Sequence, residues 1–183
     1  MFEQSKKYIS FLLNPLELLR TKKVLQVNPT VASAKPEPDE IKIFVFNYNN
    51  STAEIKELQN IPDCYNYLQS DKITWLNIDG LRKADVENIG KHYGIHYLIT
   101  EDILSLGQRP KMDEIDGVVF CLLNMLYFNE KDSAVEAEQI SIVLGKNFVI
   151  SFQEDATRDV FNPLREKLKI TGSKVRQQGA DFL

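Results

Sequence analysis

The sequence contains few of the residues that build disulfide or metal-stapled folds. Its 183 residues include two cysteines and two histidines. Cys64 and Cys121 lie far apart and belong to no CxxC pair, which predicts free thiols in a reducing compartment. A domain of this length buries roughly 70% of the surface of its unfolded chain, so it needs no disulfide or bound metal to hold its fold. The hydrophobic fraction of 43% and the charged fraction of 26% are typical of globular proteins and exclude a collagen-like or disordered chain.

Long hydrophobic runs are also missing. The longest, residues 118–128, contains Asn124 and falls short of the roughly 18 apolar residues that a membrane-spanning helix needs, so it predicts a buried strand. The amino-terminal apolar run is interrupted by Asn14 and Pro15 and has no small-residue cleavage site, which argues against a secretory signal. We therefore expect the chain as given to be soluble and unable to cross a membrane by itself.

The charge is distributed unevenly along the chain. Residues 1–35 carry six basic and two acidic residues, whereas residues 36–183 carry 16 basic and 24 acidic ones. An acidic body disfavours nucleic-acid binding, which needs a basic face to displace counterions from phosphate, and is compatible with binding cations. Residues 5–20 form a basic amphipathic segment, either a loosely ordered arm or a segment that lies on an anionic membrane.

The chain divides into an arm and a folded body. Residues 28–40 contain three prolines and are typical of a linker, so residues 1–40 are predicted to be a poorly ordered basic arm and linker, and residues 41–183 the folded domain. Gly145-Lys146 predicts a tight hairpin. Strands are predicted at 41–47, 72–79, 117–128, 138–144 and 147–153, helices at 51–58, 83–93, 97–106 and 158–170, and the opening of a further helix at 175–183. This order favours an α/β fold, a mixed β-sheet with helices on both faces, which is an αβα sandwich.

Catalytic motifs are absent: the sequence has no Gly-rich phosphate loop, GxSxG or HExxH, and no catalytic residue is predicted. His92 and His96 have a spacing that suits metal ligation on one helix face, but Gly94 between them predicts a helix end. Glu101 and Asp102 are adjacent, so on a helix they point about 100° apart and cannot chelate one ion alone. Each is either a solvated helix residue or half of a site that another element or subunit completes.

Several motifs together resemble one family. They occur in the family's order over residues 41–183: WLNIDGL (75–81), IGKHYGIHYLITEDIL (89–104), QRPK (108–111), EQIS (138–141), FQE (152–154), VFNPLRE (160–166) and GADFL (179–183). With these motifs the chain resembles the amino-terminal domain of the CorA family of magnesium and cobalt transporters. One departure is Tyr97, where the family often has proline. QRPK and EQIS are interpreted as scaffold motifs, in which Arg109 and Lys111 pair with neighbouring acids.

The resemblance implies a homopentameric ion channel of the inner or plasma membrane. Each subunit of such a channel has a cytoplasmic α/β domain, a stalk helix and two carboxy-terminal membrane helices with a Gly-Met-Asn motif. The stalk, the membrane helices and that motif are missing from this sequence. The chain would therefore be the cytoplasmic sensor domain, with no enzymatic activity, whose partners are divalent cations and other copies of itself. Its only membrane contact would come through the missing helices.

The resemblance also assigns the acidic pair. Carried over residue by residue, Asp102 and Glu101 become metal ligands for Mg²⁺, with Co²⁺ as a second candidate ion. Asp102 would face a carboxylate on a neighbouring subunit's stalk, and Glu101 would contribute to a second, weaker site. Three alternatives stay open: the same domain from a zinc-transporting member of the superfamily, a metal-dependent hydrolase that uses the pair with a histidine, and an interaction module without an ion role.

Overall fold

The computed structural model describes residues 37–68, 71–130, 133–155 and 160–183. The predicted basic arm lies almost wholly outside these residues. The strands are β1 (Lys42–Tyr48), β2 (Ala53–Leu58), β3 (Ile73–Asp79), β4 (Lys111–Ile115), β5 (Val118–Asn129), β6 (Ala134–Leu144) and β7 (Phe148–Gln153). The α-helices are α3 (Lys83–Tyr93), α4 (Tyr97–Leu104), α5 (Asn162–Lys169) and α6 (Lys174–Gln177), and the 3₁₀-helices are η2 (Ile61–Tyr67) and η4 (Ala180–Phe182).

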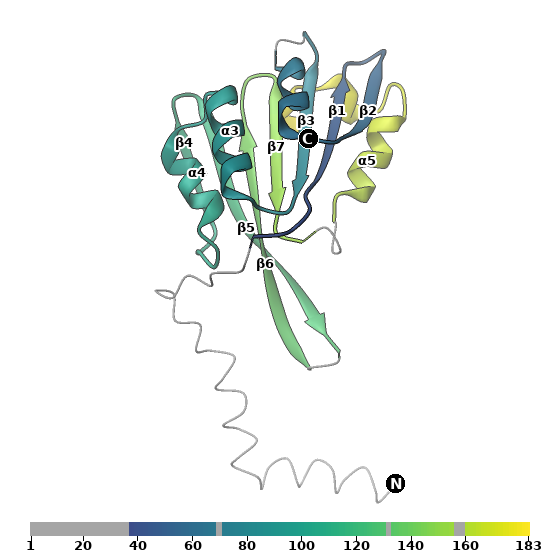
Figure 1. The fold of residues 1–183 in the computed structure, drawn as a ribbon. Coiled ribbons are helices and arrows are strands. Elements are labelled where there is room, and N and C mark those ends of the chain that lie inside the picture. The colour runs from purple at the N-terminus through teal and green to yellow at the C-terminus, as the bar shows by residue number, and fades with distance from the viewer. Residues whose placement is uncertain (1–36, 69–70, 131–132, 156–159) are drawn as a thin grey trace, which may run out of the picture. The chain divides into compact units, whose positions relative to one another are not determined.

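The strands form one seven-stranded mixed sheet with the order β2-β1-β3-β7-β6-β5-β4 (Figure 1). β1 pairs antiparallel with β2 and β3, and β7 pairs antiparallel with β6. β3 and β7 are parallel, with Trp75 opposite Val149 and Ile78 opposite Phe152. A parallel pair needs a long crossover connection, and here the connection carries α3 and α4. The prediction of an α/β fold with a mixed sheet is therefore confirmed.

Most of the predicted elements are found close to their expected positions. β1, β3, α3, α4, β5 and β7 match within one or two residues, and Gly94, with φ of 66°, ends α3. The tight hairpin is also present, because the Gly145 N–H donates to the Phe148 carbonyl at 2.9 Å. α5 is shorter than expected, and β6 begins four residues earlier than predicted. A helix does open where one was expected, as α6 at Lys174, but it ends at Gln177 and the 3₁₀-helix η4 follows, so one continuous helix over 175–183 is wrong.

Two edge strands differ from the sequence expectation. Residues 51–58 were expected to form a helix, but residues 53–58 form β2, with Val45 opposite Lys56 and Phe46 opposite Ile55. β4 was not predicted as a strand at all. Both strands lie at the sheet edges and expose most of their side chains. Charged residues therefore occupy both faces, which removes the alternation of apolar and polar residues by which a strand is usually identified.

Two hydrophobic clusters share the strands of the sheet. Along β1, Ile43 and Val45 belong to the first cluster and Phe46 and Tyr48 to the second. The first cluster also contains residues of α3 and α4, namely Val86, Ile89, Tyr93, Ile99 and Ile103. The second contains residues of α5, α6 and η4, namely Leu168, Val175 and Ala180.

A row of buried polar groups begins at Trp75, a residue of the second cluster. The Trp75 indole N–H donates to Ser151 Oγ at 2.9 Å, and that hydroxyl donates to Asn77 Oδ1 at 2.9 Å. The Asn77 amide in turn donates to Asp79 Oδ1 at 2.8 Å. Phe46 stacks on Trp75 with ring centroids 4.7 Å apart. The WLNIDGL motif thus builds the sheet interior rather than a surface site.

The chain divides into two compact units, and the elements above belong mainly to the larger one, which comprises residues 32–125 and 137–183. The described part of the smaller unit is the tip of the β5–β6 hairpin within residues 126–136. In this tip Glu136 accepts hydrogen bonds from the Tyr127 hydroxyl at 2.5 Å and from the Asn129 amide at 2.6 Å. Leu126 and Phe128 are exposed.

Helices α3 and α4 pack closely because Gly90 has no side chain. A Cβ atom at Gly90 would lie 2.5 Å from Thr100 Cγ2. Such a separation is shorter than any normal contact, so one of the two helices would have to shift. Thr100 is itself held by its hydroxyl, which donates to the Tyr97 carbonyl at 2.7 Å. Gly90 therefore sets how closely α4 approaches α3.

We expect Gly90→Ala to lower the free energy of unfolding by about 1–3 kcal/mol, the usual cost of overpacking a core contact. Urea denaturation followed by circular dichroism measures this change. Thr100→Ser removes the clashing methyl group and keeps the hydroxyl, so the double variant should recover much of the loss. Lys91→Ala, at the exposed neighbouring helix position, is the control. Equal stability of Gly90→Ala and Lys91→Ala would contradict this account of the packing.

Candidate functional site

The start of α4 is defined by a histidine cap. His96 is the N-cap residue, and its Nδ1 accepts the Leu98 N–H at 3.3 Å. The Ile95 N–H donates to the Gly90 carbonyl at 2.8 Å, which completes the turn between α3 and α4. A cap of this kind satisfies an N–H that the helix itself leaves unpaired. The position of the acidic pair along α4 therefore follows from His96 and the preceding turn.

The other histidine packs within the fold. His92 stacks on Tyr65 with ring centroids 4.0 Å apart, and its Nε2 lies 3.3 Å from the Tyr65 carbonyl oxygen. His92 therefore lies at the junction of α3 and η2, whereas His96 caps α4. The structure gives each histidine a structural role and does not bring them together with the acidic pair in a metal-binding cluster. Over the described ranges, it contains no group of three or more His, Cys, Asp or Glu side chains that could hold a metal.

Asp102 lies in the last turn of α4, and both of its carboxylate oxygens are engaged. Lys111 Nζ lies 2.6 Å from Oδ2, and the Gln108 amide donates to Oδ1 at 3.1 Å. The side chains of Asp102 and Lys111 are 25% and 33% exposed, so both groups still meet solvent. The structure therefore places Asp102 at a partly open position and pairs it with the first residue of β4. The expectation that Lys111 pairs with a neighbouring acid is confirmed.

The backbone around Asp102 is held by two glutamine side chains. Gln108 Nε2 also donates to the carbonyls of Asp102 and Ser105, each at 3.2 Å. From β6, Gln139 Nε2 donates to the carbonyls of Asp102 and Ile103, each at 3.4 Å. The carbonyls of a last helical turn have no partners within the helix. The loop after α4 and strand β6 thus supply the donors, and they hold Asp102 in place.

The EQIS and FQE motifs meet where β7 ends beside the middle of β6. The Gln139 N–H donates to Glu154 Oε1 at 2.7 Å, and the Asp155 N–H donates to Glu138 Oε1 at 2.9 Å. These reciprocal bonds fix Gln139 relative to β7. The interpretation of QRPK and EQIS as scaffold motifs agrees with these contacts, since Gln108 and Gln139 position the end of α4.

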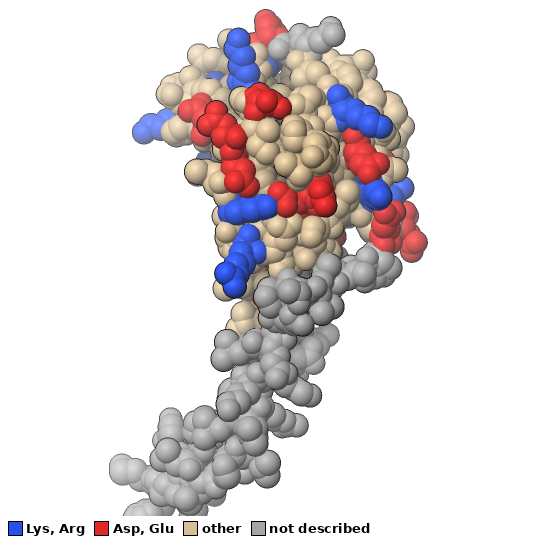
Figure 2. Space-filling view, turned by 90° about the vertical axis from the view of Figure 1, so that its left-hand side faces the viewer, with Lys and Arg blue, Asp and Glu red and all other residues tan. Residues whose placement is uncertain are grey.

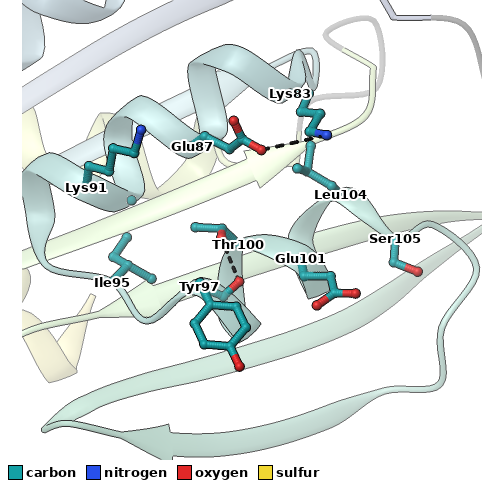
Figure 3. A pocket seen from close by; sticks show the side chains of 10 residues that line it. Lys83, Glu87, Lys91, Ile95, Tyr97, Thr100, Glu101, Leu104 and Ser105 are labelled. Atoms are coloured by element: carbon teal, nitrogen blue, oxygen red, sulfur yellow. Dashed lines mark hydrogen bonds and ion pairs between the residues drawn. The ribbon is translucent and has the colours of Figure 1, made fainter.

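Glu101 has different surroundings from Asp102. It is exposed and lines an open groove of about 720 Å³ between α3 and α4, together with Lys83, Glu87 and Lys91 from α3 (Figure 3). Tyr97 lies in the same groove and is 67% exposed. The two acidic residues therefore do not form one site within the chain. The groove is open to solvent and is far larger than a single ion needs.

The surrounding surface carries charges of both signs. Figure 2 shows acidic and basic side chains next to one another on the face that lies at the left of Figure 1.

The two cysteines are free thiols, as predicted, and burial raises the pKa of the Cys64 thiol to about 12. Cys64 therefore stays protonated and is an unsuitable metal ligand or nucleophile.

Sequence reasoning did not identify the residues that surround Asp102. Gln108 and Gln139 were placed in scaffold motifs without a stated contact, and Lys111 was only expected to pair with some acid. The spacing between Asp102 and Lys111 crosses a helix end and a turn, so no helical periodicity connects them. Gln139 lies 37 positions further along the chain. Buried polar residues inside apolar strands were the available signal, because such groups require hydrogen-bond partners.

The fold and the site define a mixed α/β domain with two adjacent carboxylates near the end of a short helix, of which Asp102 is held by the following loop, β4 and β6. Residues 70–182 match the family model described as CorA-like Mg²⁺ transporter protein. The chain belongs to this family, which confirms the resemblance seen in its motifs. The family consists of transporters and not of enzymes, in agreement with the predicted lack of enzymatic activity. In the part of the chain that the structure describes, no helix is both long and apolar enough for a membrane span.

A curated relative supports this membership. The cobalt/magnesium transport protein CorA of Thermotoga maritima is 36% identical over 168 residues, which are 90% of this chain and 47% of the relative. The chain therefore spans about half the length of that protein.

One solved structure supports the fold. The full-length CmaX protein aligns with a TM-score of 0.51 at 12% identity, over 80% of this chain and 43% of that one. The soluble domain of CorA from Methanocaldococcus jannaschii aligns with a TM-score of 0.49 at 14% identity, over 74% of this chain and 48% of that one.

The hydrogen bonds at the end of α4 lead to a testable expectation. Gln139→Leu removes the donor to the Ile103 carbonyl and should lower the free energy of unfolding by about 1 kcal/mol. Amide hydrogen exchange in α4 near Asp102 should become faster. Gln177→Leu, which removes an exposed donor to the Gly172 carbonyl, should leave exchange in α4 unchanged. Unaltered exchange at α4 in Gln139→Leu would show that this side chain does not hold the helix end.

Proposed function

We propose that this chain is the regulatory domain of a divalent-cation transporter and senses Mg²⁺ through Asp102 and Glu101 at subunit interfaces. The observation that carries the proposal is the Asp102 carboxylate, partly exposed at the end of α4 and held in place by the chain's own side chains. Family membership supplies the context of cation transport. In the whole protein, this domain would lie on the cytoplasmic face of the membrane.

The chemistry of the two carboxylates suits Mg²⁺ as half of a site. Mg²⁺ prefers oxygen ligands, dehydrates reluctantly and commonly uses only one or two carboxylates while keeping several waters. Within the described residues, neither carboxylate belongs to a group of three or more His, Cys, Asp or Glu side chains that could hold a metal. We infer that a second subunit supplies the remaining ligands. Glu101 and Asp102 would then belong to two separate sites, because Glu101 lines the α3–α4 groove and Asp102 lies beside β4.

The position of Asp102 favours a cation for an electrostatic reason. The carboxyl end of a helix carries a partial negative charge, so cations are stabilised there and anions are not. Two carboxylates about 5 Å apart at an interface would repel by roughly 3 kcal/mol at an effective dielectric constant near 20. A divalent cation between them removes this repulsion and holds the subunits together. Mg²⁺ would thereby stabilise a closed assembly of several copies, a homopentamer in our proposal.

The fold is consistent with an αβα sandwich that places the acidic helix at the surface. The alternation of β1 residues between the two hydrophobic clusters supports α3 and α4 on one face of the sheet and α5 on the other, because successive strand residues point to opposite faces.

We further propose that residues 1–40 form an arm and linker outside the domain formed by residues 41–183. Co²⁺ is a second candidate ion, in line with the name of the Thermotoga relative.

The zinc-transporting branch remains the alternative with the same fold. Zinc prefers nitrogen and sulfur ligands, and in this structure both histidines serve packing and capping roles, which favours magnesium. An interaction module without an ion role is the other alternative, and the open α3–α4 groove favours it. The loss of Mg²⁺ sensitivity in a variant of the acidic pair separates these possibilities.

In the full-length protein, Asp102→Asn should shift Mg²⁺-dependent closure to higher Mg²⁺ concentration. The substitution removes a ligand and also relieves repulsion, but the attraction to a doubly charged ion outweighs that relief at millimolar Mg²⁺. Glu101→Gln should shift closure in the same direction by less. Limited proteolysis over a Mg²⁺ titration measures the midpoint for each variant.

The matched control is Asp113→Asn, because Asp113 is an exposed acid on β4 and has no role in the proposed sites. It should keep the wild-type midpoint. A wild-type midpoint for Asp102→Asn would refute the assignment of Asp102, and a shifted midpoint for Asp113→Asn would show that the effect is not specific to the acidic pair.

A further inference from the structure

Lys111 forms an ion pair with the same carboxylate, that of Asp102, to which the proposed function assigns a divalent cation. The Lys111 ammonium lies 2.6 Å from Asp102 Oδ2, in direct contact with the carboxylate that the proposed function gives to a divalent cation. The other oxygen already accepts the Gln108 amide at 3.1 Å. A cation that approaches Asp102 therefore meets a carboxylate whose charge is already balanced by a cation of the same chain.

The geometry allows Lys111 to leave without disturbing the fold. Its backbone is fixed because Lys111 lies opposite Leu122 in the β4–β5 ladder, and Pro110 precedes it. Its side chain is 33% exposed, and a lysine ammonium on a flexible stem is easily hydrated. Departure of the ammonium thus requires only rotation of side-chain bonds, while Gln108 and Gln139 continue to hold the Asp102 backbone.

The neighbouring acids do not offer Lys111 an equally close partner among the described contacts. Its ammonium pairs with Asp102 at 2.6 Å, whereas Asp113 and Glu114 are exposed on the same edge strand. An ammonium with one unit of charge competes poorly with a divalent ion for a carboxylate, so the exchange can occur at a moderate cation concentration. A partly exposed ion pair is weak enough for a divalent cation to displace it, yet strong enough to raise the concentration of divalent cation that is needed to occupy Asp102.

We propose that Lys111 is a tethered competitor that sets the cation threshold of Asp102. Without a divalent cation its ammonium occupies the carboxylate, and binding of Mg²⁺ releases it to solvent. This inference rests on the proposed function, since it requires Asp102 to bind a cation. It adds an exchange of one cation for another and makes Lys111 a residue that positions and tunes the site without being a metal ligand.

Removal of the competitor tests the threshold. In the full-length protein, Lys111→Met keeps the length and apolar stem of the side chain and should lower the Mg²⁺ midpoint of proteolytic protection by about two- to fivefold, the effect of removing an exposed ion pair of about 0.4–1 kcal/mol. Lys111→Arg keeps the charge and should not lower the midpoint. An unchanged or raised midpoint in Lys111→Met would overturn the proposal.

Release of Lys111 is measured separately by acylation of lysine amines with an N-hydroxysuccinimide ester, followed by mass spectrometry. Labelling of Lys111 should become at least twofold faster in saturating Mg²⁺. Labelling of Lys146, exposed in the β6–β7 turn, should stay constant. In Asp102→Asn, Lys111 should be labelled rapidly even without Mg²⁺. Wild-type labelling of Lys111 that stays constant or falls with Mg²⁺ would overturn the exchange.

The two proposals fail in different ways. If Asp102→Asn shifts the midpoint but Lys111→Met does not lower it, Asp102 binds the cation and Lys111 does not compete. If Asp102→Asn keeps the wild-type midpoint, the sensing function of Asp102 fails, and the exchange at Lys111 fails with it.

Discussion

The parallel pairing of β3 with β7 is the constraint on which the rest of the structure depends. It joins the strands β2-β1-β3 to the strands β7-β6-β5-β4 in one sheet. Because parallel neighbours cannot be joined by a hairpin, the chain between Asp79 and Phe148 must leave the sheet and return. That connection contains α3, α4 and three of the strands. The acidic helix α4 is therefore part of the crossover itself.

The same connection brings the partners of Asp102 together. Lys111 begins the strand that follows α4, and Gln139 lies on the strand that pairs with β7. A carboxylate in the last turn of a helix is disfavoured by the helix dipole, and the Lys111 ammonium and the Gln108 amide offset this cost. Asp102 thus lies at a helix end that favours a cation. In our account, Mg²⁺ binds Asp102 by replacing the singly charged Lys111 ammonium.

Much of this fold could be predicted from local patterns. The β-branched runs of β1 and β3 and the stop at Gly94 lie where the sequence indicates, because burial on both faces or a left-handed residue leaves a clear signal. The edge strands β2 and β4 could not be recognised. In β2, Ile55 and Leu58 are three positions apart and fit a helix as well as a strand, and only the pairing with β1 decides between them.

The candidate site was predictable to a smaller extent. Glu101 and Asp102 were identified by resemblance to a family, and neither composition nor spacing distinguishes them from other acidic pairs on this chain. Their different surroundings, a groove for Glu101 and the Lys111 ammonium for Asp102, arise from contacts between segments that are distant in sequence. Such contacts depend on sheet register and helix packing, which a single sequence does not reveal.

The most direct test of the central claim is the anomalous diffraction of crystals of the full-length protein grown with Mn²⁺, a hard divalent cation that suits carboxylate ligands. Our account predicts an anomalous peak beside the Asp102 carboxylate, with the Lys111 side chain turned away from it. An absence of anomalous density at Asp102 while other sites on the same molecules are occupied, with Lys111 still paired, would contradict it.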